Sequence, residues 1–293
     1  MTLPAAPAAA TTAPVVAAVD GSPASLAAAH AAARTAQQLG APLRLVRVVP
    51  LPSEDPVDER GNGVALQHAG VELDRLRGEL ATLLPGQAVT AAVRRGGTAD
   101  ELTVESATAE RVVLGEHTGG PGLGAVADWL VQHADAPLLL HRGNGRPAGS
   151  VVVGLDCLPG TETLLRVAAD EACLRGAVLH VVHGRMSRVS TPGVLTAEQR
   201  LLERLVDRVR HHLPLLRVHV EARAANATTL VLEAATAAQV LVVGRRVRGA
   251  GRPTSSTGST LLLRASCPVL VVPGDDALQQ ARSTAEAREL VGR

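Results

Sequence analysis

The chain has 293 residues, of which 46% are hydrophobic and 19% are charged, and its formal net charge is +1. This length suggests about two domains of roughly 150 residues, each large enough to bury a core. The apolar fraction excludes a disordered chain. The net charge gives no electrostatic reason to expect nucleic acid or a membrane as a partner.

Several residue types that carry chemistry are missing or rare. All 29 basic residues are arginine, and Trp129 is the only aromatic residue of the Phe, Trp and Tyr class. A P-loop lysine, a Schiff-base lysine and a Ser-Lys dyad are therefore excluded, as is a stacking platform for single-stranded nucleic acid. Cys157, Cys173 and Cys267 lie far apart, which indicates neither a disulfide framework nor a zinc knuckle and fits a reducing cytoplasm.

The chain begins with a stretch rich in Ala, Pro and Thr. Residues 1–13 carry no basic residue and no continuous apolar segment, so they are expected to form a disordered tail and not a signal peptide. No apolar run approaches the about 18 residues that a membrane-spanning helix requires. We therefore expect a cytoplasmic protein.

Short apolar runs then alternate with helical patterns. The strands predicted in the first part of the chain are 15–19, 43–49, 89–93, 111–115 and 137–141. Most of them are apolar at nearly every position, as expected for parallel strands covered on both faces. The first predicted helix has Ser22 as its N-cap, Pro23 at its first position and a stop at Gly40.

A second helix is predicted from apolar residues spaced by three and four. They are Leu66, Ala69, Leu73, Leu76, Leu80 and Leu83. This spacing places them on one face of a helix. The corresponding helix later in the chain opens on Thr196-Ala197-Glu198-Gln199, which has the form of a capping box.

The chain repeats itself in three blocks that follow the same order. The equivalent pairs are Asp20 and Asp156, Gly40 and Gly176, Leu43 and Leu179, Leu102 and Val231, Gly115 and Gly244, and Pro137 and Pro268. The repeat predicts two tandem α/β domains, each a doubly wound parallel sheet with helices on both faces. The domains are expected at 14–142 and 150–274, with a linker at 143–149 and a C-terminal tail, 275–293, whose apolar spacing is compatible with a helix.

Two loops in each copy are candidates for a ligand site. In an open parallel sheet, ligands bind at the carboxyl ends of strands where the strand order reverses. One loop follows the first strand and carries Asp20-Gly21-Ser22, and the other is the glycine-rich segment 115–124 after the fourth strand. Glycines allow the backbone to approach a phosphate, and the following helix N-terminus favours an anion. The alternative is that Asp20 only caps a turn and the glycines only form a flexible loop.

These motifs together resemble the universal stress protein (UspA-like) family in its tandem two-domain form. The resemblance covers about residues 14 to 273 and rests on Val19–Ser25, the strand ends at 112–115 and 242–244, and Ser266–Val272. It implies a flavodoxin-like sheet with strand order 3-2-1-4-5. It also implies an ATP site made from an Asp after strand one, a residue ending strand two and a G-x-x-G-(nine residues)-G-[S/T] loop after strand four.

The resemblance assigns the site residues in each copy. In the first copy these are Asp20, Gly21, Ser22, Val48, Gly115, Thr118, Gly119, Gly122 and Gly124. In the second copy they are Asp156, Gly244, Ser255, Ser256, Gly258 and Ser259. Both copies depart from the motif, because Thr118 and Val247 stand where the second glycine belongs, and the second copy lacks the Gly-Ser that follows Asp20. Glu116 beside the first loop would repel a triphosphate unless it points away.

Other polar groups have simpler interpretations. Four arginines cluster on the loop after the fourth strand of the second copy: Arg245, Arg246, Arg248 and Arg252. They are expected to be solvated, or to contact phosphates if that loop binds a nucleotide. His180 and His183, and the adjacent pair His211-His212, have no carboxylate or thiol at ligand spacing, so no metal site is expected. Cys267 is expected to pack in the core.

The sequence therefore favours a cytoplasmic stress-response protein that binds an adenine nucleotide, ATP with Mg²⁺, in at least one domain and acts as a sensor or regulator. No catalytic constellation is present, so at most slow incidental hydrolysis is expected. An ATP-pyrophosphatase would need an S-G-G-x-D-S-like loop after strand one, which is missing. The alternative is a nucleotide-free interaction module. The two domains are expected to pair as a pseudo-dimer through 137–141 and 269–273, and a homodimer stays open.

Overall fold

The computed structural model describes residues 13–50, 56–116, 122–143, 145–156, 160–185, 192–245 and 256–274. Of residues 56–62, 192–195 and 256 it describes the backbone alone. The described chain divides into two compact units between His141 and Arg142. They correspond to the two sequence repeats, which we call the first copy (13–141) and the second copy (142–274). The predicted tails, 1–13 and 275–293, lie outside the described residues, apart from Ala13.

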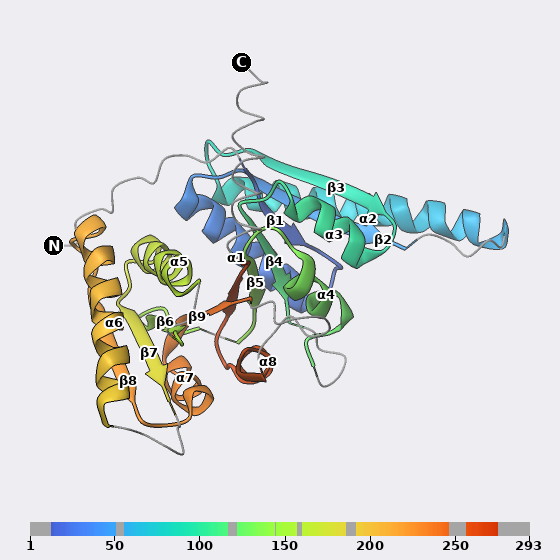
Figure 1. Ribbon diagram of the computed structural model, residues 1–293. Helices are drawn as coiled ribbons and strands as arrows, with labels where there is room; N and C mark the ends of the chain where they lie inside the picture. The colour runs from blue at the N-terminus through green and yellow to red at the C-terminus, as the bar shows by residue number, and fades with distance from the viewer. Residues whose placement is uncertain are drawn as a thin grey trace. The chain divides into compact units, whose positions relative to one another are not determined.

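The first copy alternates strands and helices along its whole length. Its elements are β1 Val15–Ala18, α1 Pro23–Leu39, β2 Leu43–Val49, α2 Pro56–Leu83, β3 Val89–Arg95, α3 Thr98–Ser106, β4 Arg111–Gly115, α4 Ala125–His133 and β5 Leu138–His141. The strands are parallel and lie in the order β3-β2-β1-β4-β5 (Figure 1). This is the predicted 3-2-1-4-5 order.

The second copy repeats the arrangement. Its elements are β6 Ser150–Gly154, α5 Thr161–Leu174, β7 Leu179–Gly184, α6 Pro192–His212, β8 Val218–Arg223, α7 Ala227–Ala235, β9 Ala238–Gly244, α8 Ser256–Arg264 and β10 Val269–Val272. The strands are again parallel, in the order β10-β9-β6-β7-β8. Figure 1 shows α6 on one side of β7 and β8 and α7 on the other. The predicted fold class is confirmed in both copies.

Local signals explain where α1 begins and ends. The Ser22 side chain accepts a hydrogen bond from the Ser25 N–H at 3.2 Å, and Pro23 opens the helix. At the other end Gly40 has a φ of 65°, the left-handed conformation that costs glycine little. The helix buries a face of alanines, whose small side chains let it approach the strands closely.

Two details of the long helices differ from the sequence prediction. Leu83, the last residue of α2, is 51% exposed, whereas Leu84, the residue after the helix, is 2% exposed and takes the buried position next to Leu80. Helix α6 begins at Pro192, before the predicted capping box at Thr196. Gln199, which would have closed that box, instead donates to Glu203 Oε1 at 3.1 Å, and the neighbouring Glu198 carboxylate contacts His183 and Arg185.

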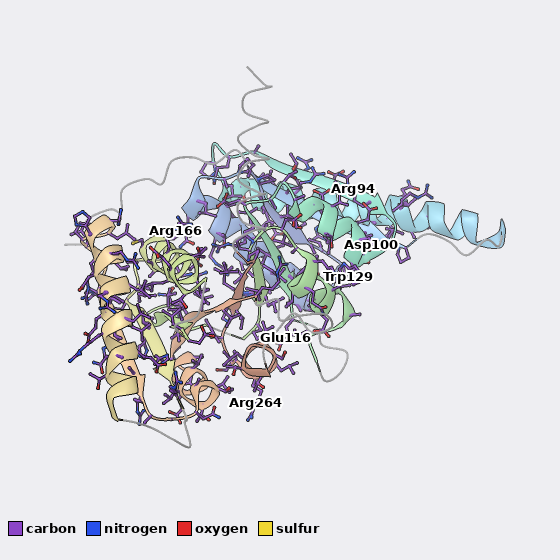
Figure 2. All side chains as sticks on the ribbon, in the orientation of Figure 1. Arg94, Asp100, Glu116, Trp129, Arg166 and Arg264 are labelled. Carbon is purple, nitrogen blue, oxygen red and sulfur yellow. The ribbon has the colours of Figure 1, made fainter. Side chains whose placement is uncertain are left out.

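A buried carboxylate joins α3 to two strands of the first copy. Glu105 on α3 is 6% exposed, and it accepts hydrogen bonds from Arg44 Nε at 2.7 Å and from Arg94 Nε at 2.9 Å. Arg94, labelled in Figure 2, lies on β3, and Arg44 lies on β2. Burial alone would raise the pKa of Glu105, but the hydrogen bonds and charges of the two arginines outweigh it and lower the pKa.

Replacing Glu105 with glutamine is expected to lower the free energy of unfolding by about 2 kcal/mol at pH 7, because charged hydrogen bonds to two arginines are lost. The folded-state pKa of Glu105 lies below its ordinary value of 4.5, so its contribution is complete above that value and disappears as the pH falls through the folded pKa. The difference between Glu105→Gln and the wild type should therefore shrink below about pH 4.5.

Urea unfolding at pH 7 and at descending pH values measures this difference. Glu79→Gln is the control, since Glu79 is exposed and pairs with the partly exposed His30, and we expect a change within about 0.5 kcal/mol. A Glu105→Gln variant as stable as the wild type at pH 7 would show that the buried network does not stabilise the fold.

Candidate functional site

In the first copy, the structure places Gly115, where the second predicted loop starts, next to the segment that carries the first predicted loop. Asp20 follows β1, and Gly115 is the last residue of the neighbouring strand β4. A Cβ atom on Gly115 would lie 2.5 Å from the Ala24 carbonyl oxygen and 2.8 Å from the Ser25 nitrogen. Only glycine leaves room for this contact, so the end of β4 lies directly against the first turn of α1.

Asp20 is held in a tight turn at the start of α1. Its Oδ1 accepts a hydrogen bond from the Ser22 N–H at 2.8 Å, while its own N–H donates to Ser25 Oγ at 3.3 Å. Partial burial would raise the pKa of Asp20, but the hydrogen bonds from Ser22 and Ser25 outweigh it and lower the pKa. The carboxylate is thus ionised near neutral pH, exposed to solvent and fixed in orientation, as an acceptor for a ligand hydroxyl or amino group requires.

An arginine that the sequence analysis did not single out lies beside this turn. Gly21 has a φ of 89°, and a Cβ atom built on it would lie 3.5 Å from Arg47 Nη1. Arg47 comes from β2 and pairs with Glu72 of α2. Val48, the predicted base-lining residue, follows Arg47 and is half-buried on the opposite face of β2. Arg47 precedes Val48 near the end of β2, and this position in the sequence could have identified Arg47 as a candidate site residue.

Of the predicted phosphate loop, 115–124, the structure describes the first two residues and the last three. Glu116 is exposed after β4 and is labelled in Figure 2, whereas Thr118 and Gly119 lie outside the described residues. Gly122 and Gly124 have φ values of 117° and 80°, a conformation that side chains disfavour. Gly124 is the N-cap of α4 and supplies no side-chain hydrogen bond to the helix. The amide groups of the first turn of α4 therefore lack a side-chain cap at this loop.

The corresponding loops of the second copy are arranged less tightly. Asp156 follows β6 and is exposed. A Cβ atom on Gly244 would meet only the Leu164 side chain, at 3.3 Å, where Gly115 meets backbone. Ser255 lies outside the described residues, and the other three predicted residues, Ser256, Gly258 and Ser259, lie in the first turn of α8.

In the second copy, the residues that align with Arg47 and Val48 are packed against other parts of the protein. His183 aligns with Arg47 and is 3% exposed. Its Nδ1–H donates to the Leu155 carbonyl at 2.8 Å, and its Nε2 lies 3.1 Å from Glu198 Oε2. Gly184 aligns with Val48, and a Cβ atom on it would lie 2.6 Å from the Ala227 Cα.

The fold places carboxylates beside His180 and His183, although the sequence has none at ligand spacing from them. Glu198 of α6 lies beside His183, and Glu221 of β8 lies beside His180 at 3.1 Å. Both carboxylates are distant in sequence, and the fold brings them to the histidines. Cys267 is buried, as expected for packing, and burial raises the pKa of its thiol. Of the helices that the structure describes, none has the length and apolar content to span a bilayer.

Comparison with known proteins agrees with this architecture. The sequence profile of the Universal stress protein family matches residues 12–142 and again residues 148–273. A universal stress protein of Mycobacterium tuberculosis (strain CDC 1551 / Oshkosh) is 29% identical over 306 residues, covering 90% of this chain and 96% of the relative. The crystal structure of a universal stress protein from Archaeoglobus fulgidus superposes with a TM-score of 0.70 at 17% identity, covering 89% of this chain and 98% of that one. The chain therefore belongs to the universal stress protein family, with two tandem domains of that family.

Proposed function

We propose that the first copy binds an adenine nucleotide, ATP with Mg²⁺, and that the protein acts through this binding as a sensor or regulator and not as an enzyme. The observation that carries the proposal is the backbone contact of Gly115 with Ala24 and Ser25. This contact supports the proposal, because the ionised Asp20 turn lies beside the strand end from which the glycine-rich segment starts, and doubly wound folds bind their ligands at such strand ends.

The described residues suit the two ends of a nucleotide. The Asp20 carboxylate would accept a hydrogen bond from a ribose hydroxyl or a base amino group. The loop ending at Gly122 and Gly124, with the first-turn amides of α4, would face the phosphates. Arg47 would supply a guanidinium group near Gly21, provided that it releases Glu72. Mg²⁺ would enter with the triphosphate, which the ion neutralises in part.

We propose further that the second copy does not bind a nucleotide. There the His183–Glu198 contact and the packing of Gly184 against Ala227 take the places of Arg47 and Val48. The nucleotide-free interaction module, which the sequence left as the alternative for the whole protein, thus becomes the proposal for this copy. Pairing of the two copies through β5 and β10 stays a prediction.

Trp129 offers a test that reports on the first copy alone. It is the only tryptophan, and it lies on α4, the helix that follows the proposed phosphate loop (labelled in Figure 2). Its Nε1–H donates to Thr103 Oγ1 at 3.2 Å. Titration of the nucleotide-free protein with ATP and Mg²⁺ should give a saturable change in its fluorescence. At about 100 times the dissociation constant the ligand should also add about 2.7 kcal/mol of stability. The proposal would be contradicted if ATP and Mg²⁺ changed neither the fluorescence nor the stability of the protein.

A further inference from the structure

Two histidines and a glutamate converge on the outer strands of the second copy. The parallel register of β7 and β8 sets His180 directly opposite His219, and Glu221 follows two residues later on the same face of β8. One potential ligand atom from each residue lies within 4.8 Å of the others. His180 Nε2 is 3.1 Å from Glu221 Oε2, and the two imidazole rings are 4.8 Å apart.

This cluster is accessible and oriented. The side chains of His180 and Glu221 are 18% and 27% exposed, and His219 is exposed, so an ion can reach them from solvent. Arg223 Nη1 donates to Glu221 Oε1 at 3.1 Å and leaves Oε2 directed at His180. Hydrogen bonds of this kind, from outside the ligand set, commonly fix a ligating carboxylate.

The first copy provides an internal comparison, because different residue types occupy the equivalent positions on its strands. Leu43 pairs with Val89 as Leu179 pairs with Val218, so His180, His219 and Glu221 correspond to Arg44, Thr90 and Ala92. In the first copy, Arg44 bonds to Glu105 of α3. Through the alignment of Leu102 with Val231, the position of Glu105 is Ala234 in the second copy. The buried ion pair between helix and strand is therefore replaced by a cluster confined to the strands.

We propose that His180, His219 and Glu221 bind one divalent transition-metal ion, with Zn²⁺ as the best fit. Two imidazoles and one carboxylate are a common protein ligand set for Zn²⁺ and leave a fourth position for water. Ligand atoms at about 2.0 to 2.2 Å from a tetrahedral ion lie roughly 3.3 Å apart, close to the separation between His180 and Glu221. The ion would take the place of the hydrogen atom between His180 Nε2 and Glu221 Oε2, and the neutral imidazole would carry its proton on Nδ1.

The environment of His180 supports the neutral imidazole that a metal requires. Burial and the neighbouring His219 lower the pKa of His180, and they outweigh Glu221, which raises it. An ion bound by residues of both strands would cross-link β8, the last strand in the order, to β7. This site does not depend on nucleotide binding, because all three ligands come from the second copy.

Titration of the metal-stripped, nucleotide-free full chain with Zn²⁺ tests the proposal, by calorimetry and by competition with a chromogenic chelator. The expected result is one equivalent bound, with affinity reduced at least about tenfold in both His219→Ala and Glu221→Gln. His219→Ala removes an exposed side chain and Glu221→Gln conserves shape, so both variants should fold, which circular dichroism checks. His30→Ala is the matched control, because His30 pairs with Glu79 at 3.3 Å and belongs to the other copy.

Two results for the wild type and the site variants, and one for the control, would overturn the proposal. One is that the wild-type chain binds no equivalent of Zn²⁺ that the chelator competition can detect. The other is that His219→Ala and Glu221→Gln bind Zn²⁺ as tightly as the wild type, since the ion would then be held elsewhere. A loss of affinity in His30→Ala equal to that in His219→Ala would also contradict a specific site.

Discussion

Replacing Gly115 with valine is expected to lower the free energy of unfolding of the first copy by about 3 kcal/mol, the upper part of the usual range for overpacking. A Cβ atom at this position would lie 2.5 Å from the Ala24 carbonyl oxygen and 2.6 Å from its carbon. These are backbone atoms of the first turn of α1, and they cannot move without displacing the helix. The variant should therefore also separate the two loops that form the proposed nucleotide site.

Urea unfolding followed through Trp129 measures this effect in the first copy, because the chain has no other tryptophan. Gly78→Ala is the matched control. Gly78 lies on the exposed side of α2, where a Cβ atom would meet nothing within 4 Å, so alanine should stabilise the copy by about 0.5 to 1 kcal/mol. A Gly115→Val variant as stable as the wild type would mean that the end of β4 and the start of α1 are not in contact.

Asp20→Ala is expected to weaken nucleotide binding by about 10- to 150-fold, the loss of one hydrogen bond to a charged group. Asp20 also accepts the Ser22 N–H, so alanine removes a turn contact as well as the proposed ligand contact. Asp20→Asn separates the two effects, because its side-chain oxygen can still accept from Ser22. We expect Asp20→Asn to retain stability while it loses affinity, measured by equilibrium titration with ATP and Mg²⁺.

Asp156→Ala is the control for this experiment, since it changes the equivalent carboxylate of the second copy. The proposal predicts an unchanged affinity in Asp156→Ala. Weaker binding in that variant with normal binding in Asp20→Ala would place the nucleotide in the second copy and would contradict the assignment made here.

Local sequence signals predicted much of the fold. Ser22, Pro23 and Gly40 set the ends of α1 through their own backbone preferences, and the apolar runs give the strands of both copies. Helix ends and strands depend on neighbouring residues, so the sequence contains them in a readable form. The strand order that both copies share was implied by the family resemblance alone.

Contacts between distant residues could not be predicted in the same way. The approach of Glu221 to His180 depends on the register between β7 and β8, and the bonds of Glu198 depend on how α6 packs. A shift of one residue in that register would turn Glu221 to the other face of the sheet. The steric requirement at Gly115 depends in the same way on the distance between β4 and α1.

Calorimetric titration of nucleotide-stripped protein with ATP and Mg²⁺, evaluated for stoichiometry, tests the central claim most directly. We predict one nucleotide bound per chain. Two sites would show that the contacts of His183 and Gly184 do not close the second copy. No heat at several temperatures, with no rise in melting temperature, would contradict nucleotide binding in the first copy.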